Sequence, residues 1–247
     1  MLKSLKKMVK PIMKLDKWAK GVLFLAVILI LCLVMNLHIP VQEGFVQRKK
    51  FVMKEGIDCY DDFYSEIYDD LVYDEVKNDF EIGELDRLIK PTKRSRILDV
   101  GSGCGHHVSM MKKFGCPAEG VDISPSMVKK AKKKYKDCNY KQGDAINNML
   151  YPRNSFSTVT CFYFTIYYME EKKKFINNVY DWLKPGGYFL LHLVNRDKFD
   201  PILYTADPLH IVSAQKYAKK RITNSLVKFK DFQYKANFHL DKENDLA

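Results

Sequence analysis

The sequence predicts an α/β fold, in which a doubly wound and mostly parallel sheet is preceded by a single transmembrane helix. Three observations support this fold class. Short apolar segments of strand composition alternate with segments of helical periodicity from about residue 96 to residue 194. A glycine-rich turn at 101–105 lies between the first strand and the helix that follows it. Ahead of this region, residues 21–42 carry no formal charge.

The N-terminal segment has the composition of a membrane anchor. Residues 22–35 are apolar throughout, and about 20 residues of helix match a hydrocarbon core of about 30 Å. A cleaved signal peptide is disfavoured because no small-x-small site follows the apolar run. We therefore expect a basic cytosolic or interfacial tail over 1–20, a transmembrane helix over 21–41, a linker over 42–57 and one folded domain over 58–247.

Charge and cysteine content narrow the class of protein. The formal charge is +11, but the first 20 residues hold seven lysines and one acid, which leaves +5 on the remaining 227 residues. Such a basic tail either lies on an anionic membrane surface or is solvated. The six cysteines show no C-x-x-C spacing, which disfavours a zinc site, and their scatter indicates a reducing compartment.

The domain is expected to start with two amphipathic helices. Apolar side chains recur at helical spacing over 60–71 and over 82–89, and the second helix ends before Pro91. Five strands follow, at 96–100, 118–122, 139–142, 156–162 and 188–194. Helices are expected between them, over 105–114, from the N-cap Ser124 onward, and over 170–183. Because strands and helices alternate, the sheet is parallel and carries helices on both faces.

Near the C-terminus, alternating side chains predict a β-hairpin. Phe232, Tyr234 and Ala236 alternate with polar residues, whereas Val227 has the opposite parity, so the chain bends between them. We expect the hairpin over 225–240. It is either the last part of the sheet or part of an insertion that covers the substrate.

The glycine-rich turn carries the clearest functional signal. In a dinucleotide-binding loop the third glycine would stand at position 106, where this chain has His106. Asp99, two residues ahead of the first glycine, would repel a pyrophosphate but attract an ammonium group. Asp122 ends the second strand, from which a carboxylate accepts hydrogen bonds from ribose hydroxyls. With Asp144 placed for an adenine, the pattern predicts a nucleoside that has a cationic tail.

Four segments resemble, in order and spacing, the motifs of class I S-adenosylmethionine-dependent methyltransferases. They are Ile97-Leu-Asp-Val-Gly-Ser-Gly-Cys-Gly105, Val121-Asp-Ile-Ser124, Gly143-Asp-Ala145 and Leu183-Lys-Pro-Gly-Gly-Tyr-Phe-Leu-Leu191. The likeness covers about residues 60–194 and is greatest to the small-molecule branch typified by ubiquinone- and menaquinone-biosynthesis enzymes. It implies a Rossmann-like fold and S-adenosylmethionine as the methyl donor.

The resemblance also implies which residues contact this cofactor. Asp99 lies near its amino group, Asp122 holds the ribose, and Ile123 packs on the adenine. Tyr64 and Tyr68 resemble residues that close over the cofactor, although simple core packing is the alternative. The full set expected at the cofactor is Tyr64, Tyr68, Asp99, Gly101, Ser102, Gly103, Asp122, Ile123, Asp144, Ala145 and Cys161.

The acceptor is expected at the end of the fourth strand, where the chain reads Cys161-Phe-Tyr-Phe-Thr-Ile-Tyr-Tyr168. Neither Asn-Pro-Pro-Tyr nor Pro-Cys is present, which disfavours methylation of DNA bases or protein glutamine. Methyl transfer from a sulfonium needs positioning, and it needs a base only where the nucleophile carries a proton. Tyr163, Thr165 and Tyr167 are the catalytic candidates, with packing as their alternative role. No metal is expected at His106 or His107.

The sequence therefore predicts methyl transfer to a small-molecule or lipid-like acceptor at a membrane. The alternatives are methylation of a protein or RNA, and a non-catalytic membrane-tethered module that binds S-adenosylmethionine. The lysine-rich helix after Asp122 is expected to be a solvated face, so nucleic acid is a disfavoured partner. We expect the domain to face the cytosol, where the donor is made, although the positive-inside rule applied to the N-terminal lysines favours the opposite orientation.

Overall fold

The computed structural model describes residues 16–38, 51–195, 198–203 and 214–238. The chain divides into two compact units, residues 1–53 and residues 54–247. The second unit contains the sheet, the helices packed on it and the candidate site. Residues 1–15 of the tail predicted over 1–20 and most of the predicted linker lie outside the described residues.

The first unit contains helix α2 (Lys17–His38). Across the part of the chain that the structure describes, no helix is long and apolar enough to cross a membrane. The transmembrane segment predicted over 21–41 is therefore not supported. The helix starts four residues earlier than predicted, so its first turn contains Lys17 and Lys20, and residues 39–41 lie outside the described part.

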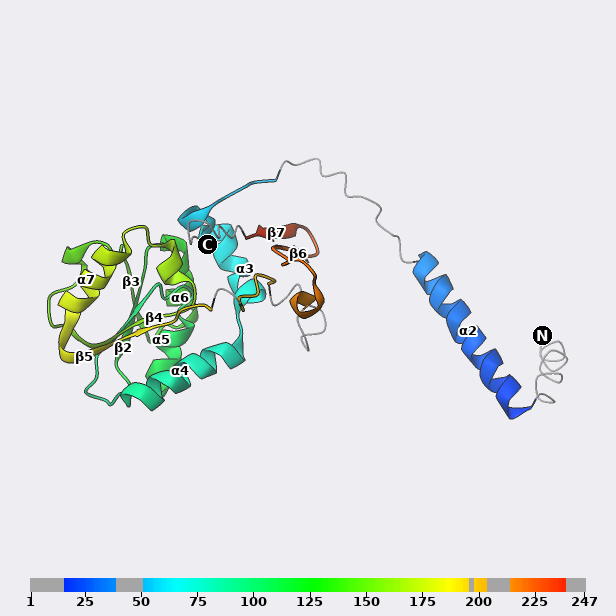
Figure 1. Cartoon of the computed structure of the whole chain (residues 1–247), viewed down its shortest axis with the longest axis horizontal. Helices are drawn as coiled ribbons and strands as arrows, with labels where there is room; N and C mark the ends of the chain where they lie inside the picture. Colours follow the sequence, from blue (N-terminus) through cyan, green and yellow to red (C-terminus); the bar gives the residue numbers. More distant parts are fainter. Residues whose placement is uncertain (1–15, 39–50, 196–197, 204–213, 239–247) are drawn as a thin grey trace. The chain divides into compact units, whose positions relative to one another are not determined.

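The second unit is built on a five-stranded parallel sheet (Figure 1). Its strands are β1 (Ile97–Val100), β2 (Ala118–Asp122), β3 (Asn139–Gln142), β4 (Phe156–Cys161) and β5 (Leu183–Leu191). The strand order is β3-β2-β1-β4-β5. The chain begins at the central strand β1, adds β2 and β3 on one side, and then crosses to add β4 and β5 on the other side of β1. This confirms the doubly wound fold, and it creates a switch point between β1 and β4, where ligands bind in such sheets.

Helices cover both faces of the sheet, as predicted. They are α3 (Asp62–Val72), α4 (Glu75–Ile89), α5 (His106–Lys113), α6 (Pro125–Lys134) and α7 (Lys172–Trp182), with short 3-10 helices η1 (Gly56–Cys59), η2 (Asn148–Leu150), η3 (Thr165–Tyr168) and η5 (Ala214–Tyr217). Phe175 and Trp182 of α7 are fully buried in one cluster, which includes Leu98 of β1. Ile97 of the same strand points into a second cluster with Met111 of α5. Neighbouring β1 residues thus face opposite helical layers.

Local chemistry explains most helix starts. The Ser124 side chain accepts a hydrogen bond from the Met127 amide at 3.1 Å, which confirms the predicted N-cap of α6. Asp74 caps α4 in the same way, accepting from the Lys77 amide at 3.1 Å, so this helix begins at Glu75 rather than near residue 82. Strand β5 also begins earlier than predicted, because residues 183–187 extend the pairing with β4 through an irregular register.

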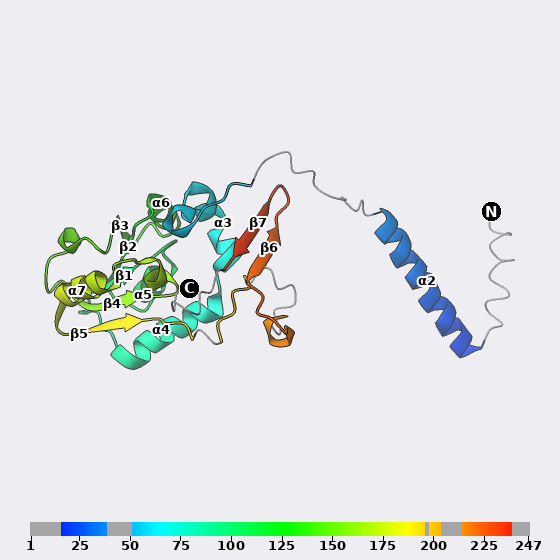
Figure 2. The same ribbon diagram turned by 45° about the horizontal axis from the view of Figure 1, so that its top comes forward.

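The C-terminal hairpin forms a sheet of its own. Strands β6 (Asn224–Lys228) and β7 (Gln233–Asn237) pair antiparallel, which confirms the predicted hairpin with a start one residue earlier than predicted. Among the described residues they do not pair with the five-stranded sheet, so the version in which the hairpin completes that sheet is wrong. Figure 2 shows the hairpin beside α3. The Phe63 and Phe232 rings pack edge to face with centroids 5.1 Å apart. The hairpin therefore contacts α3 through aromatic side chains.

Candidate active site

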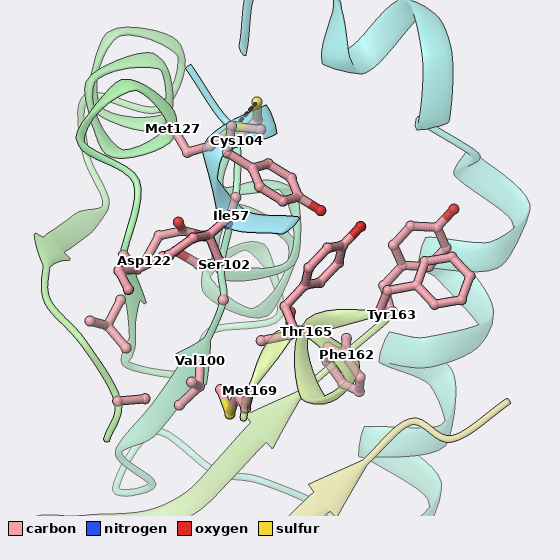
Figure 3. A pocket seen from close by; sticks show the side chains of 18 of the residues that line it. Ile57, Val100, Ser102, Cys104, Asp122, Met127, Phe162, Tyr163, Thr165 and Met169 are labelled. Carbon is pink, nitrogen blue, oxygen red and sulfur yellow. Dashed lines mark hydrogen bonds between the residues drawn. The ribbon is translucent and has the colours of Figure 1, made fainter. Parts of the chain in front are cut away.

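A cavity of about 680 Å³ opens at the carboxyl ends of β1, β2 and β4. This volume lies within the range of small-molecule sites, roughly 300–1,000 Å³. The position is the switch point of the sheet, so the fold brings the glycine loop, the end of β2 and the turn after β4 to one place. Figure 3 shows Asp122 and Ser102 on one side of the cavity, opposite Thr165 and Tyr163.

Glycine is required at the turn after β1 for two reasons. Gly101 has a φ of +71°, and a Cβ added there would lie 2.3 Å from side-chain atoms of Thr165. Gly103 has a φ of +52°, and a Cβ at this residue would meet only open space. The first glycine therefore allows the turn to pack against η3, and the second leaves the backbone accessible to a ligand.

The side chain of Asp122 joins the glycine loop to the end of β2 through hydrogen bonds. One carboxylate oxygen accepts a hydrogen bond from the Gly103 amide at 2.8 Å, and the other accepts from the Ser124 amide at 2.9 Å. Burial raises the pKa of Asp122, while these two amides oppose the shift. Each oxygen keeps a second lone pair. Asp122 is thus able to accept further hydrogen bonds from hydroxyl groups in the cavity.

Asp99 lies beneath the loop rather than in the cavity lining. It is 1% exposed, and Thr160 donates its hydroxyl to Oδ1 at 2.7 Å. The other oxygen, Oδ2, is buried and has no hydrogen-bond partner among the described residues. Burial raises the pKa of Asp99 to about 6. An unpartnered carboxylate oxygen is costly, so this position fits a cationic group that reaches it directly or through a water molecule.

The structure brings most of the predicted site residues together in the cavity lining. Those that line it are Tyr68, Gly101, Ser102, Gly103, Asp122, Ile123, Asp144, Ala145, Tyr163 and Thr165. The others, besides Asp99, are Tyr64, Cys161 and Tyr167. Cys161 is 1% exposed in the core cluster, and Tyr167 accepts a hydrogen bond from the Val194 amide at 2.9 Å through its hydroxyl. Tyr64 packs against Tyr234 of the hairpin, with ring centroids 5.8 Å apart, and is not part of the cavity lining.

Several residues that line the cavity were not among the predicted site residues. Tyr60 and Tyr168 come from different segments, and Lys77 comes from α4. A buried carboxylate, Glu81, accepts from Lys77 at 2.9 Å and lies 2.8 Å from His107 Nε2. It also lies 2.6 Å from Nδ1 of His192. Although burial opposes it, these partners hold the pKa of Glu81 well below its usual range. Only the tertiary packing of α4, α5 and the segment after β5 reveals this cluster.

His106 belongs to a second, partly buried cluster, which joins three helices. Its Nε2 lies 2.7 Å from Asp69 of α3, and its Nδ1 lies 2.9 Å from the Tyr135 hydroxyl. Asp69 also accepts from Lys134 of α6 at 2.5 Å. Both histidines that follow the glycine loop are therefore paired with carboxylates.

Comparison with known proteins matches the part of the chain that contains most of the five-stranded sheet. Residues 97–187 match a family model described as "Methyltransferase domain". The chain is 30% identical over 117 residues to the ubiquinone biosynthesis O-methyltransferase of Coxiella burnetii, covering 46% of this chain and 49% of the relative. It is 24% identical over 158 residues to the phosphoethanolamine N-methyltransferase of Plasmodium falciparum, covering 60% and 55%. The crystal structure of YcgJ from Bacillus subtilis matches with a TM-score of 0.43 and 26% identity, covering 45% of this chain and 49% of that chain.

The chain spans about half the length of the curated relatives it matches. The residues of the cavity fit the methyl donor of the matched family. Asp122 offers acceptors to a ribose, and Asp99 holds an unpartnered oxygen near the loop, as a nucleoside with a cationic tail requires. Residues 97–187 of this chain therefore form an S-adenosylmethionine-dependent methyltransferase domain.

Proposed function

We propose that the protein is an active methyltransferase that transfers a methyl group from S-adenosylmethionine to a small-molecule or lipid-like acceptor. The observation that carries this proposal is one cavity at the switch point, lined on one side by Ser102 and Asp122 and on the other by Tyr163 and Thr165. The two curated relatives described above, a ubiquinone biosynthesis O-methyltransferase and a phosphoethanolamine N-methyltransferase, support a small acceptor.

The residues of the chain act by binding, orienting and excluding water. When bound, S-adenosylmethionine supplies an electrophilic methyl group on a sulfonium. Asp122 accepts the ribose hydroxyls, and Ile123, Asp144 and Ala145 border the base, as the resemblance implies. The aromatic residues after β4 line the opposite wall, where they keep water from the acceptor. Catalysis of this kind depends mainly on a near-attack arrangement of nucleophile and methyl group.

The test combines binding and turnover on the full chain. Calorimetry is expected to show S-adenosylmethionine binding, and incubation with a labelled methyl donor and a lipid-containing cell extract is expected to give a labelled small molecule. Label recovered in protein or RNA would contradict the small-molecule acceptor. Binding without label transfer to any fraction would instead support a non-catalytic binding module.

The cellular location is a separate proposal that rests on the sequence. We infer that the chain is a single-pass membrane protein whose domain faces the cytosol. Residues 22–35 are apolar, and the methyl donor is made in the cytosol and crosses bilayers poorly. After alkaline carbonate extraction the chain is expected in the membrane pellet, and a Leu25→Arg/Leu29→Arg variant is expected in the supernatant. Recovery of the unaltered chain in the supernatant would contradict an integral anchor.

A further inference from the structure

Three tyrosines from separate segments meet in the cavity, and we call them the tyrosine cage: Tyr60 after η1, Tyr68 of α3 and Tyr168 of η3. The rings of Tyr60 and Tyr168 lie 5.5 Å apart at an interplanar angle of 84°. Tyr68 and Asp122 belong to the same cavity lining. The cage therefore stands beside the carboxylate assigned to the ribose.

The position of the cage is held by the packing around it. The backbone carbonyl of Tyr60 accepts a hydrogen bond from the Ser124 hydroxyl at 2.5 Å, which fixes this residue over the end of β2. Tyr64 packs edge to face against both Tyr60 and Tyr68, with centroids 5.4 and 5.7 Å apart. Burial raises the pKa of Tyr60 and of Tyr68 well above the usual range, so both phenols are neutral near pH 7.

The charge of the cavity favours a cation. The lining contains five carboxylates, namely Glu55, Asp122, Asp144, Glu170 and Glu171. Its basic residues are Lys77, His106 and His107, and each is paired with a carboxylate outside the lining, Glu81 or Asp69. The basic lining residues thus have carboxylate partners outside the lining, whereas the five acidic residues border the cavity itself.

Perpendicular tyrosine rings and an acidic lining together match one ligand chemistry. Aromatic faces attract a desolvated ammonium group through the ring quadrupole, and the cage offers three tyrosine rings from separate segments of the cavity lining. The carboxylates of the lining add electrostatic attraction for a cation. We propose that the acceptor is an amine, whose ammonium form and N-methylated product are bound by Tyr60, Tyr68 and Tyr168. This inference rests on the proposed methyltransferase activity and narrows its substrate class.

The step balances without an additional reactant. A protonated acceptor first releases its proton to a water molecule, and a tertiary amine in its free form has none to release. The nitrogen lone pair then forms the new N–CH₃ bond, while the S–CH₃ bond breaks and its electron pair stays on sulfur. The positive charge passes from sulfur to nitrogen. The cage stabilises the ammonium product at the point where this charge arrives.

The test compares a cation with its neutral isostere on the full chain saturated with S-adenosylhomocysteine. The probes are choline and 3,3-dimethylbutan-1-ol, which have similar shape and differ in charge. Choline is expected to bind at least about tenfold more tightly by calorimetry. Tyr60→Leu and Tyr168→Leu are each expected to weaken choline binding at least about fivefold, and the ring-preserving Tyr60→Phe and Tyr168→Phe are expected to retain it. The Phe variants keep the test valid if a Leu variant does not fold.

Several results would overturn the inference while leaving the proposed function intact. Equal binding of the two probes, or binding of neither, would show that the cavity does not select an ammonium group. Methylation of neutral phenols but of no amine would exclude an amine acceptor. If only the donor sulfonium used the cage, choline would not bind and the Leu variants would weaken S-adenosylmethionine more than S-adenosylhomocysteine. Failure of the chain to bind either nucleoside would instead refute the proposed function itself.

Discussion

Asp99, which is buried, and Asp122, which is partly buried, both lie beside the glycine loop, yet their hydrogen bonding differs. Each oxygen of Asp122 already accepts one backbone amide, so this residue shapes the loop as well as the site. Asp99 has one oxygen bound to Thr160 and one without a partner among the described residues. Because unpaired buried groups are costly, we expect Asp99 to lower the stability of the free protein and to favour a cationic ligand.

Replacing Asp122 with alanine is expected to weaken S-adenosylmethionine binding by about 2–4 kcal/mol, because two charge-assisted hydrogen bonds to the ribose are lost. Calorimetry measures the change. Glu119→Gln, on the same strand but outside the cavity lining, is the matched control and is expected to bind normally. Unchanged affinity in the alanine variant would contradict the ribose assignment.

Asp99 predicts a specific pH dependence. Its folded pKa of about 6 exceeds the ordinary value of 3.8, so burial disfavours the charged form of the folded protein. The free protein is therefore expected to lose about 1–3 kcal/mol of stability as the pH rises from about 4 to about 6. Asp99→Asn removes this loss, and urea unfolding at pH 7.5 is expected to show a more stable free protein.

The same variant is expected to bind S-adenosylmethionine more weakly, since the ionised carboxylate that attracts the ammonium group is gone. Affinity of the unaltered protein is expected to rise with pH around 6, and the variant is expected to lose this rise. A variant that is less stable than the parent at pH 7.5, with unchanged affinity, would show that Asp99 serves only the fold.

At the scale of elements, one carboxylate of α3 joins this helix to both α5 and α6. Asp69 pairs with His106 of α5 and Lys134 of α6, at 2.7 and 2.5 Å. Although burial opposes it, these partners lower the pKa of Asp69 to about 2. The hairpin adds aromatic contacts to the same helix through Phe63. Helix α3 carries Tyr68 of the cage, so its anchoring determines the geometry of the acceptor side.

Asp69→Ala is expected to destabilise the domain by about 1–3 kcal/mol, because His106 and Lys134 both lose their partner. Urea unfolding near pH 7 measures this change. Asp70→Ala removes a neighbouring exposed carboxylate of the same helix and is expected to change stability by less than about 0.5 kcal/mol. In the parent, the contribution of Asp69 is fully present above about pH 4 and is lost as the pH falls toward about 2. Equal stability of the two variants would show that the cluster does not anchor α3.

At the scale of the whole molecule, the chain combines an apolar N-terminal helix with a catalytic domain. Residues 22–31 of α2 are apolar and largely exposed. An exposed apolar surface of this kind marks contact with a membrane or a partner. In the proposed single-pass arrangement, the orientation of the domain would determine whether the methyl donor can reach the cavity.

Cys59 is the natural reporter of this orientation. Of the described cysteines, Cys104, Cys116, Cys138 and Cys161 are buried, whereas Cys59 is partly exposed. Burial raises the pKa of the Cys59 thiol, so labelling must be compared between intact and permeabilised cells. A membrane-impermeant maleimide is expected to label the chain only after permeabilisation, and Cys59→Ala is expected to remove that signal. Equal labelling of intact cells would place the domain outside the cytosol.

The order of helices and strands, the glycine turn and the nucleoside with a cationic tail were all predictable from the sequence. Each depends on short-range chemistry: the period of apolar residues, the N-cap Ser124, or the positive φ of Gly101 and Gly103. Such signals lie within a few residues of one another, so they are readable without the fold. The position of Asp122 at the edge of the cavity was also predictable. The residue ends a strand, and the carboxyl ends of the strands border the ligand site in this class of sheet.

Only the tertiary structure decided which side chains face the cavity and which partners they have. The Glu81 cluster joins residues as far as 111 positions apart, and the tyrosine cage joins three separate segments. Tyr64 was predicted at the cofactor, but the hairpin packs on it, and Tyr60 and Tyr168 line the cavity instead. The hairpin itself was readable as alternating residues, whereas its packing on α3 was not. Packing of distant segments depends on the shapes of the surfaces that meet, and no local pattern of residues encodes those shapes.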